Sequence, residues 1–265
     1  MQRLFISLTI FIVTFFPFSD CAGRTVVAPE DPDRHQTRYD PIRDGERVLY
    51  QASWNGIPIA KAKIHSTSVW RSGKKFYQVR IRAKTYKYLD LIWKMRDSIE
   101  STFEADTLSP HRFVFRQREN RKRVDTTALY DHGSKKWVVL RQKGHKVRQY
   151  EFQSSSALDP ILATYYFRTI DFDVGDELRS EVLGGKSRYL VILKVVGKEQ
   201  IQVKAGNFDA YKIIPRVINL TRSGYSKRMR HATVWVSADI NRRVLKVASQ
   251  VFVGSIYIEL LRAME

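Results

Sequence analysis

Residues that could carry acid–base or metal chemistry are few and scattered along the chain. None of the six histidines has the HxH or HExxH spacing of a zinc site. The acidic residues Asp97, Glu100, Glu104 and Asp106 form one cluster, but side chains alternate between the two faces of a strand, so Asp97 and Glu104 would point apart. The sequence contains no GxSxG elbow and no Gly-rich phosphate loop. We therefore expect no enzymatic activity, no cofactor and no metal. The histidines are His35, His65, His111, His132, His145 and His231.

The single cysteine, Cys21, rules out a disulfide within one chain and a cysteine metal site. One interpretation makes Cys21 the acylated first residue of a lipoprotein. The preceding residues Phe18, Ser19 and Asp20 match poorly the small and apolar residues that precede an acylated cysteine. Ordinary cleavage near Ala22 or Gly23 is therefore the favoured prediction.

The N-terminal residues have the pattern of a secretory signal peptide. A short positive start is followed by the apolar run Leu4–Phe18, which is shorter than the roughly 20 residues that a membrane-spanning helix needs. We predict a signal peptide over 1–23, export to the periplasm, and no transmembrane helix in the mature chain. Residues 24–44 are rich in proline and charge, and predict a flexible linker.

The formal net charge of +19 would suggest nucleic acid in a cytoplasmic protein, but export points to envelope polyanions instead, such as anionic lipid or lipopolysaccharide. Residues 111–150 hold twelve Lys and Arg against three acids, and 222–230 form a second basic stretch. A solvated basic surface and an anion-docking surface both explain this pattern. The candidate anion-contacting residues are Arg116, Arg118, Arg121, Lys122, Arg123, Arg222, Lys227, Arg228 and Arg230.

The segment Tyr86–Met95 (YKYLDLIWKM) is strongly apolar and aromatic. A core strand or covering segment is the favoured interpretation, and the alternative is a lip that grips a ligand or touches a membrane. Together with one residue of the helix described below, it supplies the candidate ligand-binding residues Tyr86, Tyr88, Leu91, Trp93 and Tyr165.

Most of the remaining chain alternates with the period of β-strands. Asn55–Gly56 between two such runs is typical of a type I′ hairpin turn. In 76–84, Tyr77 and Val79 share one face, while the basic residues lie on the other, as in a half-buried antiparallel strand. The turn after the next basic strand is expected at 121–123.

One stretch has helical spacing instead. Asp159 can accept hydrogen bonds from the first-turn amides, and Pro160 suits the first helical position. Ile161, Leu162, Tyr165 and Tyr166 then form one apolar face.

Beyond this helix the pattern predicts further hairpins. They pair 177–183 with 187–196, and 198–204 with 208–218. The segments around Asp106 and Asp239 resemble each other, each with a strand, an Ala-Asp turn and a second strand, which suggests two similar halves. We predict an all-β, mainly antiparallel fold: a curved sheet or half-barrel with one short helix near 159–169. A single domain would span 45–265, with pseudo-repeated halves 45–153 and 170–265.

From Gly45 onward the chain resembles the bacterial exported family described as domain of unknown function 3108. The resemblance rests on Gly45–Tyr50 with Trp54–Pro58, Arg96–Ser101, Asp106–Pro110, Asp159–Arg168, Gly175–Asp176, Ala205–Ala210, and Trp235 with Asp239 and Arg242. Where the family commonly has a proline after the second Asp turn, this chain has Arg243. The resemblance implies an envelope location and a mostly β fold, and no established activity.

Two functions remain open from the sequence. In the first, the concave apolar side of the sheet holds an amphiphile and basic residues contact its anionic headgroup. In the second, the protein is an interaction or scaffolding module for another envelope protein, with no small ligand.

Overall fold

The structure is a computed structural model, and it describes residues 25–27, 42–221, 230–251 and 253–264. Within these residues, fifteen strands form one sheet, accompanied by one α-helix and one short 3-10 helix. The predicted signal peptide 1–23, with Cys21, lies outside the described residues. The elements are β1 (Thr25–Val27), β2 (Arg47–Trp54), β3 (Ile57–Arg71), β4 (Lys74–Thr85), η2 (Lys87–Leu89), β5 (Arg96–Glu104), β6 (Pro110–Glu119), β7 (Lys122–Asp131), β8 (Lys136–Lys143), β9 (Lys146–Gln153), α1 (Pro160–Thr169), β10 (Glu177–Leu183), β11 (Arg188–Val203), β12 (Gly206–Asn219), β13 (Arg230–Ser237), β14 (Val244–Gln250) and β15 (Ser255–Met264).

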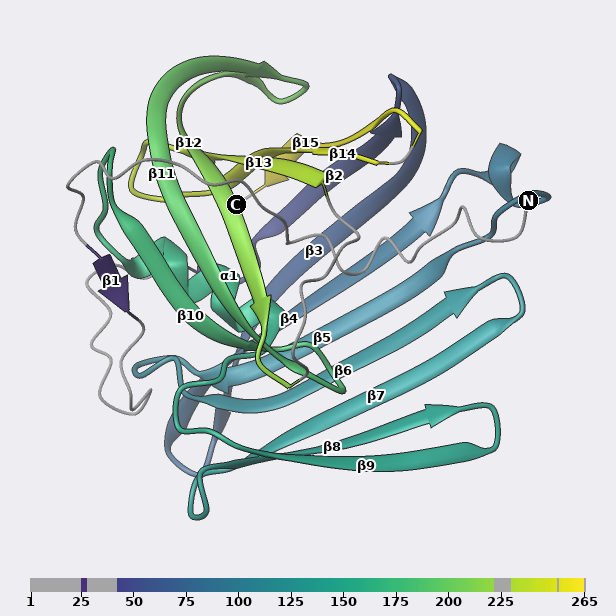
Figure 1. The fold of residues 1–265 in the computed structure, drawn as a ribbon, viewed down its shortest axis with the longest axis vertical. Helices are drawn as coiled ribbons and strands as arrows, with labels where there is room; N and C mark the ends of the chain where they lie inside the picture. Colours follow the sequence, from purple (N-terminus) through teal and green to yellow (C-terminus); the bar gives the residue numbers. More distant parts are fainter. Residues whose placement is uncertain (1–24, 28–41, 222–229, 252, 265) are drawn as a thin grey trace.

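The sheet confirms the predicted fold class: mainly antiparallel, curved and unclosed, with one helix on its concave side (Figure 1). Its strand order is β1-β10-β11-β12-β13-β14-β15-β2-β3-β4-β5-β6-β7-β8-β9. The join is made by β15, which pairs antiparallel with β2 and so brings the C-terminal residues beside the first strand of the domain. The segments 45–153 and 170–265 therefore lie on either side of this join, and their repetition stays a prediction.

One predicted turn forms at the expected residues, and another is displaced. Asn55 and Gly56 form the predicted β2–β3 turn with φ of 47° and 85°. The β6–β7 turn is instead Asn120–Arg121, because Asn120 takes the positive φ (48°), and Lys122 and Arg123 already belong to β7.

The predicted break between 196 and 198 was also wrong, since β11 continues through it. A register shift between Val195 and Gly197 marks a β-bulge there. A glycine inside a strand can be accommodated as such a bulge without a turn.

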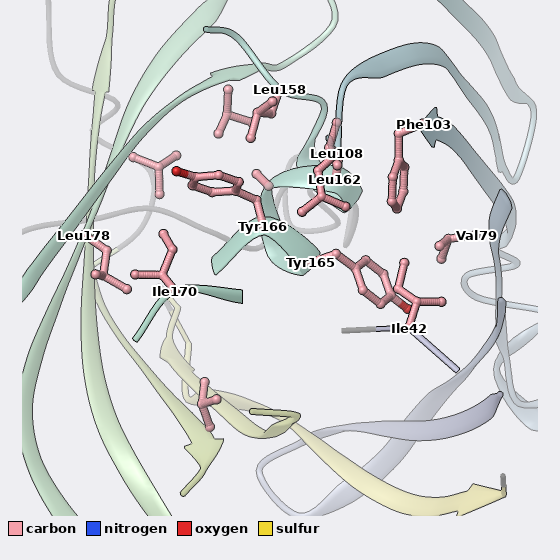
Figure 2. Packing of buried hydrophobic residues seen from close by; sticks show 14 of the residues in the cluster. Ile42, Val79, Phe103, Leu108, Leu158, Leu162, Tyr165, Tyr166, Ile170 and Leu178 are labelled. Atoms are coloured by element: carbon pink, nitrogen blue, oxygen red, sulfur yellow. The ribbon is translucent and has the colours of Figure 1, made fainter. Parts of the chain in front are cut away.

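Helix α1 forms as predicted, and it fills the concave side of the sheet. Pro160 is its first residue, Asp159 caps it, and Arg168 lies in its last turn. Figure 2 shows Leu162, Tyr165 and Tyr166 pointing outward from the helix toward strands on different sides. The main apolar cluster joins these side chains to Tyr77, Val79 and Phe103 of β4 and β5, and to Leu178, Val191 and Ile213 of β10–β12. The helix is thus the centre of the core.

Parts of the predicted linker 24–44 contact the domain. Thr25–Val27 form β1, which pairs parallel with Glu177–Arg179 of β10. Ile42 is buried in the main cluster beside the helix (Figure 2). Residues 28–41 between them lie outside the described part of the chain.

Candidate functional site

On the concave side of the sheet, the buried polar groups around α1 are hydrogen-bonded to one another. The fully buried Asp159 carboxylate accepts hydrogen bonds from the amides of Ile161 (2.9 Å) and Leu162 (3.1 Å) and from Ser101 Oγ of β5 (2.7 Å). Burial raises the pKa of Asp159 to about 6, although these hydrogen bonds act to lower it. This carboxylate therefore joins the start of α1 to the sheet.

The other end of α1 has a second buried polar group. The Tyr165 hydroxyl lies 3.1 Å from Ser66 Oγ of β3. Nearby, Arg243 Nη2 donates to Glu46 Oε1 at 2.6 Å, and the Tyr50 hydroxyl donates to the carbonyl of Val244 at 2.7 Å. Burial raises the pKa of the Tyr165 hydroxyl and of the Tyr50 hydroxyl, so both stay protonated. Tyr165, a candidate ligand-binding residue, is thus buried in the main apolar cluster with its hydroxyl bonded to β3.

At one rim of the sheet, four turns are joined by hydrogen bonds. The β4–β5 loop contacts the β2–β3 turn through a hydrogen bond from the Tyr88 hydroxyl to the carbonyl of Pro58. The β2–β3 turn contacts the β14–β15 turn through Trp54 Nε1 and the carbonyl of Val253, 2.8 Å apart. On the other side, Lys94 N donates to Asn120 Oδ1 of the β6–β7 turn at 2.7 Å. We call these four joined turns the β4–β5 rim.

The β4–β5 loop is held firmly from below. Trp93 and Met95 are buried in a cluster with Ala52 and Ala60 of β2 and β3. The Tyr86 hydroxyl donates to Gln51 Oε1 at 2.8 Å. These contacts hold both ends of the loop on the sheet. The outer residues of the loop therefore project from a firmly held segment.

An ion pair braces the middle of the same loop. Arg96 Nη2 lies 2.6 Å from Asp90 Oδ2, and Thr85 Oγ1 donates to Asp90 Oδ1 at 3.0 Å. Burial acts to raise the pKa of Asp90, but the hydrogen bonds from Arg96 and Thr85 outweigh it and leave that pKa below its ordinary value. The acid of this loop is therefore ionised and already paired.

Large apolar side chains project from the braced loop into solvent. Leu91 is 98% exposed, Ile92 68% and Tyr88 57%. Ile57 of the β2–β3 turn and Val253 of the β14–β15 turn are also exposed. Single exposed apolar residues are ordinary, whereas several on adjoining turns mark an interaction surface. We call these five residues the apolar tip.

Positive charge surrounds the apolar tip. Lys87 and Lys94 are exposed on the loop itself, and Arg121, Lys122 and Arg123 are exposed at the β6–β7 turn. The acids of these two turns are Asp90, which pairs with Arg96, and the buried Glu119, which pairs with Lys122 at 3.3 Å. The rim therefore combines an apolar centre with unbalanced positive charge.

The candidate ligand-binding residues are divided by this geometry. Tyr86 and Tyr88 stack with their ring centroids 5.7 Å apart, and Leu91 lies on the same loop. Trp93, only 6% exposed, is a core residue beneath the loop, and Tyr165 lies on α1. Ile57, Ile92 and Val253 were missed. The Asn55–Gly56 turn signal placed Ile57 at a hairpin tip, but nothing local indicated that this tip adjoins the aromatic loop.

The candidate anion-contacting residues are divided as well. Arg116 is exposed in the middle of β6. Arg118 donates two hydrogen bonds to Asp125, at 2.7 and 3.0 Å, and these bonds raise the pKa of Arg118. Arg230 is the first residue of β13. Arg222, Lys227 and Arg228 lie outside the described residues, which leaves Arg121, Lys122 and Arg123 as the predicted cations at the rim.

The acidic cluster considered for catalysis is paired with backbone and basic groups. Asp97 accepts from the Arg118 amide at 2.7 Å, Glu100 pairs with Arg80 and Arg112, and Glu104 pairs with Lys74. Among the described residues, no group of three or more His, Cys, Asp and Glu side chains is arranged to hold a metal ion. No helix in the described ranges is both long and apolar enough to cross a membrane.

Comparison with known families agrees with the resemblance seen in the sequence. The model of the family described as "Protein of unknown function (DUF3108)" matches residues 49–261. The chain belongs to this family. No curated protein matches the chain.

Three solved structures resemble this chain at low sequence identity. One is a "beta-barrel-like protein of domain of unknown function DUF1849" from Brucella abortus, with 10% identity and a TM-score of 0.49, over 82% of this chain and 96% of the other. A "putative lipoprotein" from Parabacteroides distasonis has 12% identity and a TM-score of 0.42, over 87% and 100%. A "putative exported protein with YmcC-like fold" from Bacteroides fragilis has 10% identity and a TM-score of 0.36, over 86% and 99%.

Proposed function

We propose that this protein is an exported, non-catalytic protein of the cell envelope that docks on an anionic lipid surface through the β4–β5 rim. The observation that carries the proposal is the exposure of Leu91 and Ile92 on a loop that the Asp90–Arg96 ion pair holds rigid. An apolar tip ringed by Lys and Arg suits the boundary between acyl chains and anionic headgroups. Export rests on the signal-like residues 1–23.

The energies of the two contributions are of the right size for reversible docking. Full burial of a Leu or Ile side chain is worth about 1.5–3 kcal/mol. Each Lys or Arg close to an anionic surface adds about 1 kcal/mol, and this contribution falls with salt. Leu91, Ile92 and the three cations of Arg121–Arg123 would together contribute about 6–9 kcal/mol. Tyr88 has the aromatic body and polar end that favour a membrane interface.

Sedimentation with vesicles of phosphatidylglycerol and phosphatidylcholine tests the proposal directly. The wild-type protein should sediment with these vesicles at low salt and not with phosphatidylcholine alone. Leu91→Ser with Ile92→Ser should weaken binding at every salt concentration by at least about a hundredfold, because two side chains lose their burial. Reversal of Arg121, Lys122 and Arg123 to Glu should weaken binding mainly at low salt.

Matched controls lie away from the β4–β5 rim. Ile240→Ser removes a side chain that is 65% exposed at the β13–β14 turn, and it should leave vesicle binding unchanged. Arg71, Lys198 and Lys204 are exposed, and their reversal to Glu changes the net charge by the same amount as reversal of 121–123. If both charge reversals weaken binding equally, the attraction is only that of net charge. Failure of the wild-type protein to bind the anionic vesicles at low salt would refute the proposal.

A further inference from the structure

The two edges of the sheet differ in whether other segments of the chain cover them. At one end, β10 is covered by β1 and by the segment before the helix, where Leu158 N donates to the Glu181 carbonyl at 2.9 Å and Leu183 N donates to the Leu158 carbonyl at 2.8 Å. At the other end, β9 pairs with β8 and with no further strand of the described chain. Figure 1 shows β9 along the lower margin of the sheet.

The hydrogen-bond register identifies the backbone groups that β9 leaves open. Ser154 N donates to the carbonyl of Lys135 at 3.1 Å, and Lys143 is opposite Lys146 across a two-residue turn. Bonded and non-bonded pairs alternate in an antiparallel ladder, so Val147, Gln149 and Glu151 direct their N–H and C=O groups away from β8. Gln153 has the same phase, and its carbonyl indeed accepts from Arg188 Nη1 at 3.0 Å instead of from β8.

The side chains along this edge define the chemistry of a strand that could pair with it. Lys143, Lys146 and Arg148 are exposed at the β8–β9 hairpin. The acid of β9, Glu151, is already bound by Lys136 (2.8 Å) and by the side-chain amide of Gln149 (2.9 Å). Positive charge therefore dominates the edge, while Val147, 61% exposed, offers an apolar contact on the opposite face from Lys146 and Arg148.

We propose that the β9 edge is a docking site for an extended acidic segment of a partner protein, which adds a strand beyond β9. The open N–H and C=O groups of Val147, Gln149 and Glu151 would bond to its backbone. Acidic side chains at alternate positions would face Lys146 and Arg148, since directly opposite residues share a face. A second copy of this chain fits less well, because both strands would bring Lys146 and Arg148 to the same seam. The proposal does not depend on the lipid-binding one.

The test uses a fluorescein-labelled peptide of alternating Glu and Val residues, with fluorescence anisotropy of the full chain as the readout. Gln149→Pro removes one outward N–H and leaves the β8 ladder intact, since proline is tolerated at an edge position whose N–H faces away. This variant should bind the peptide with about tenfold lower affinity, as expected for the loss of one or two backbone hydrogen bonds. Gln149→Ala keeps the N–H and should bind as the wild type does.

Two further measurements separate backbone pairing from simple charge attraction. Lys146→Glu with Arg148→Glu should also weaken the acidic peptide at least about tenfold. A peptide that carries N-methyl groups at every second residue, with the same charge, should bind only when those groups face away from β9. Circular dichroism and the melting temperature of each variant check that the fold is kept.

Several results would overturn the proposal. They are no binding of the acidic peptide by the wild-type chain, equal binding by the proline and alanine variants, or indifference to the phase of N-methylation. A dimer of the wild-type chain in sedimentation equilibrium that Gln149→Pro dissociates would assign the edge to a second copy instead. Vesicle binding should be unaffected by Gln149→Pro, so failure here and failure of lipid docking are distinguishable.

Discussion

The buried carboxylate of Asp159 should make the stability of this protein fall as the pH rises from about 4 to about 6. The pKa of Asp159 in the folded protein is about 6, against 3.8 for an ordinary Asp, because burial disfavours the charged form. A group whose folded-state pKa is raised stabilises the fold fully below its unfolded pKa. This stabilisation is lost as the pH passes through the folded pKa. The difference of 2.2 pH units corresponds to about 3 kcal/mol.

The variant Asp159→Asn removes this titration with little change of shape. Its amide oxygen can still accept from the amides of Ile161 and Leu162, and the Ser101 hydroxyl can accept from the amide NH2 in place of donating. Asn also ranks with Asp as a helix N-cap. The free energy of unfolding of the wild type minus that of the variant should therefore decrease by about 2.5 kcal/mol between pH 4 and pH 7, since the first part of the loss falls below pH 4.

Urea titrations at a series of pH values give this difference, in which the titration of all other carboxylates cancels. Asp131→Asn is the control of opposite sign, because hydrogen bonds from Ser134 and Gly133 lower the pKa of that exposed carboxyl. Its wild-type-minus-variant difference should increase as the pH rises toward the ordinary Asp pKa of 3.8 and stay nearly constant above it. A difference for Asp159→Asn that stays constant from pH 4 to pH 7 would refute the reasoning, and would mean that the capping carboxyl titrates normally.

Two stability predictions concern neighbouring residues with opposite exposure and a buried ion pair. Trp93→Ala should lower the free energy of unfolding by about 3–5 kcal/mol in urea titrations, because its ring is in the core. Leu91→Ser should change it by less than about 0.5 kcal/mol, because that side chain is in solvent. Equal losses would contradict the description of the loop. Arg243→Met should cost about 3 kcal/mol by leaving Glu46 buried without its cation, and the double variant with Glu46→Gln should recover part of that loss. Additive losses in this double-mutant cycle would mean that the two side chains are not coupled.

Features that depend on a few adjacent residues could be predicted from the sequence. The cap at Asp159 with Pro160 determines where α1 begins, and Asn55–Gly56 determines a hairpin, since both act through backbone angles and bonds within a few residues. The continuity of β11 through Gly197 could not be predicted in this way. Whether a glycine forms a turn or a bulge depends on the partner strand, here β12, which holds the register on both sides of it.

The pairing of β15 with β2 is the clearest non-local feature of the fold. It brings Trp54 of the β2–β3 turn against Val253 of the β14–β15 turn, almost two hundred residues apart in sequence. No local pattern encodes this contact. Val253 joins the apolar tip only because of this pairing, so the tip could be foreseen at Tyr88 and Leu91 but not at Val253.

The apolar segment Tyr86–Met95 did not reveal by itself which of its residues would be buried and which exposed. In the β4–β5 loop, Trp93 and Leu91 are two residues apart, yet the first is 6% exposed and the second 98%. The larger ring is the anchor, because it packs on the sheet against Ala52 of β2 and Ala60 of β3, and the ion pair Asp90–Arg96 fixes the direction of the intervening chain. Exposure of Leu91 is thus a consequence of tight packing beneath it. A loop that packs its largest side chain inward while holding smaller apolar ones outward has a surface defined by its own core, and this is the physical reason to look for a partner at that surface.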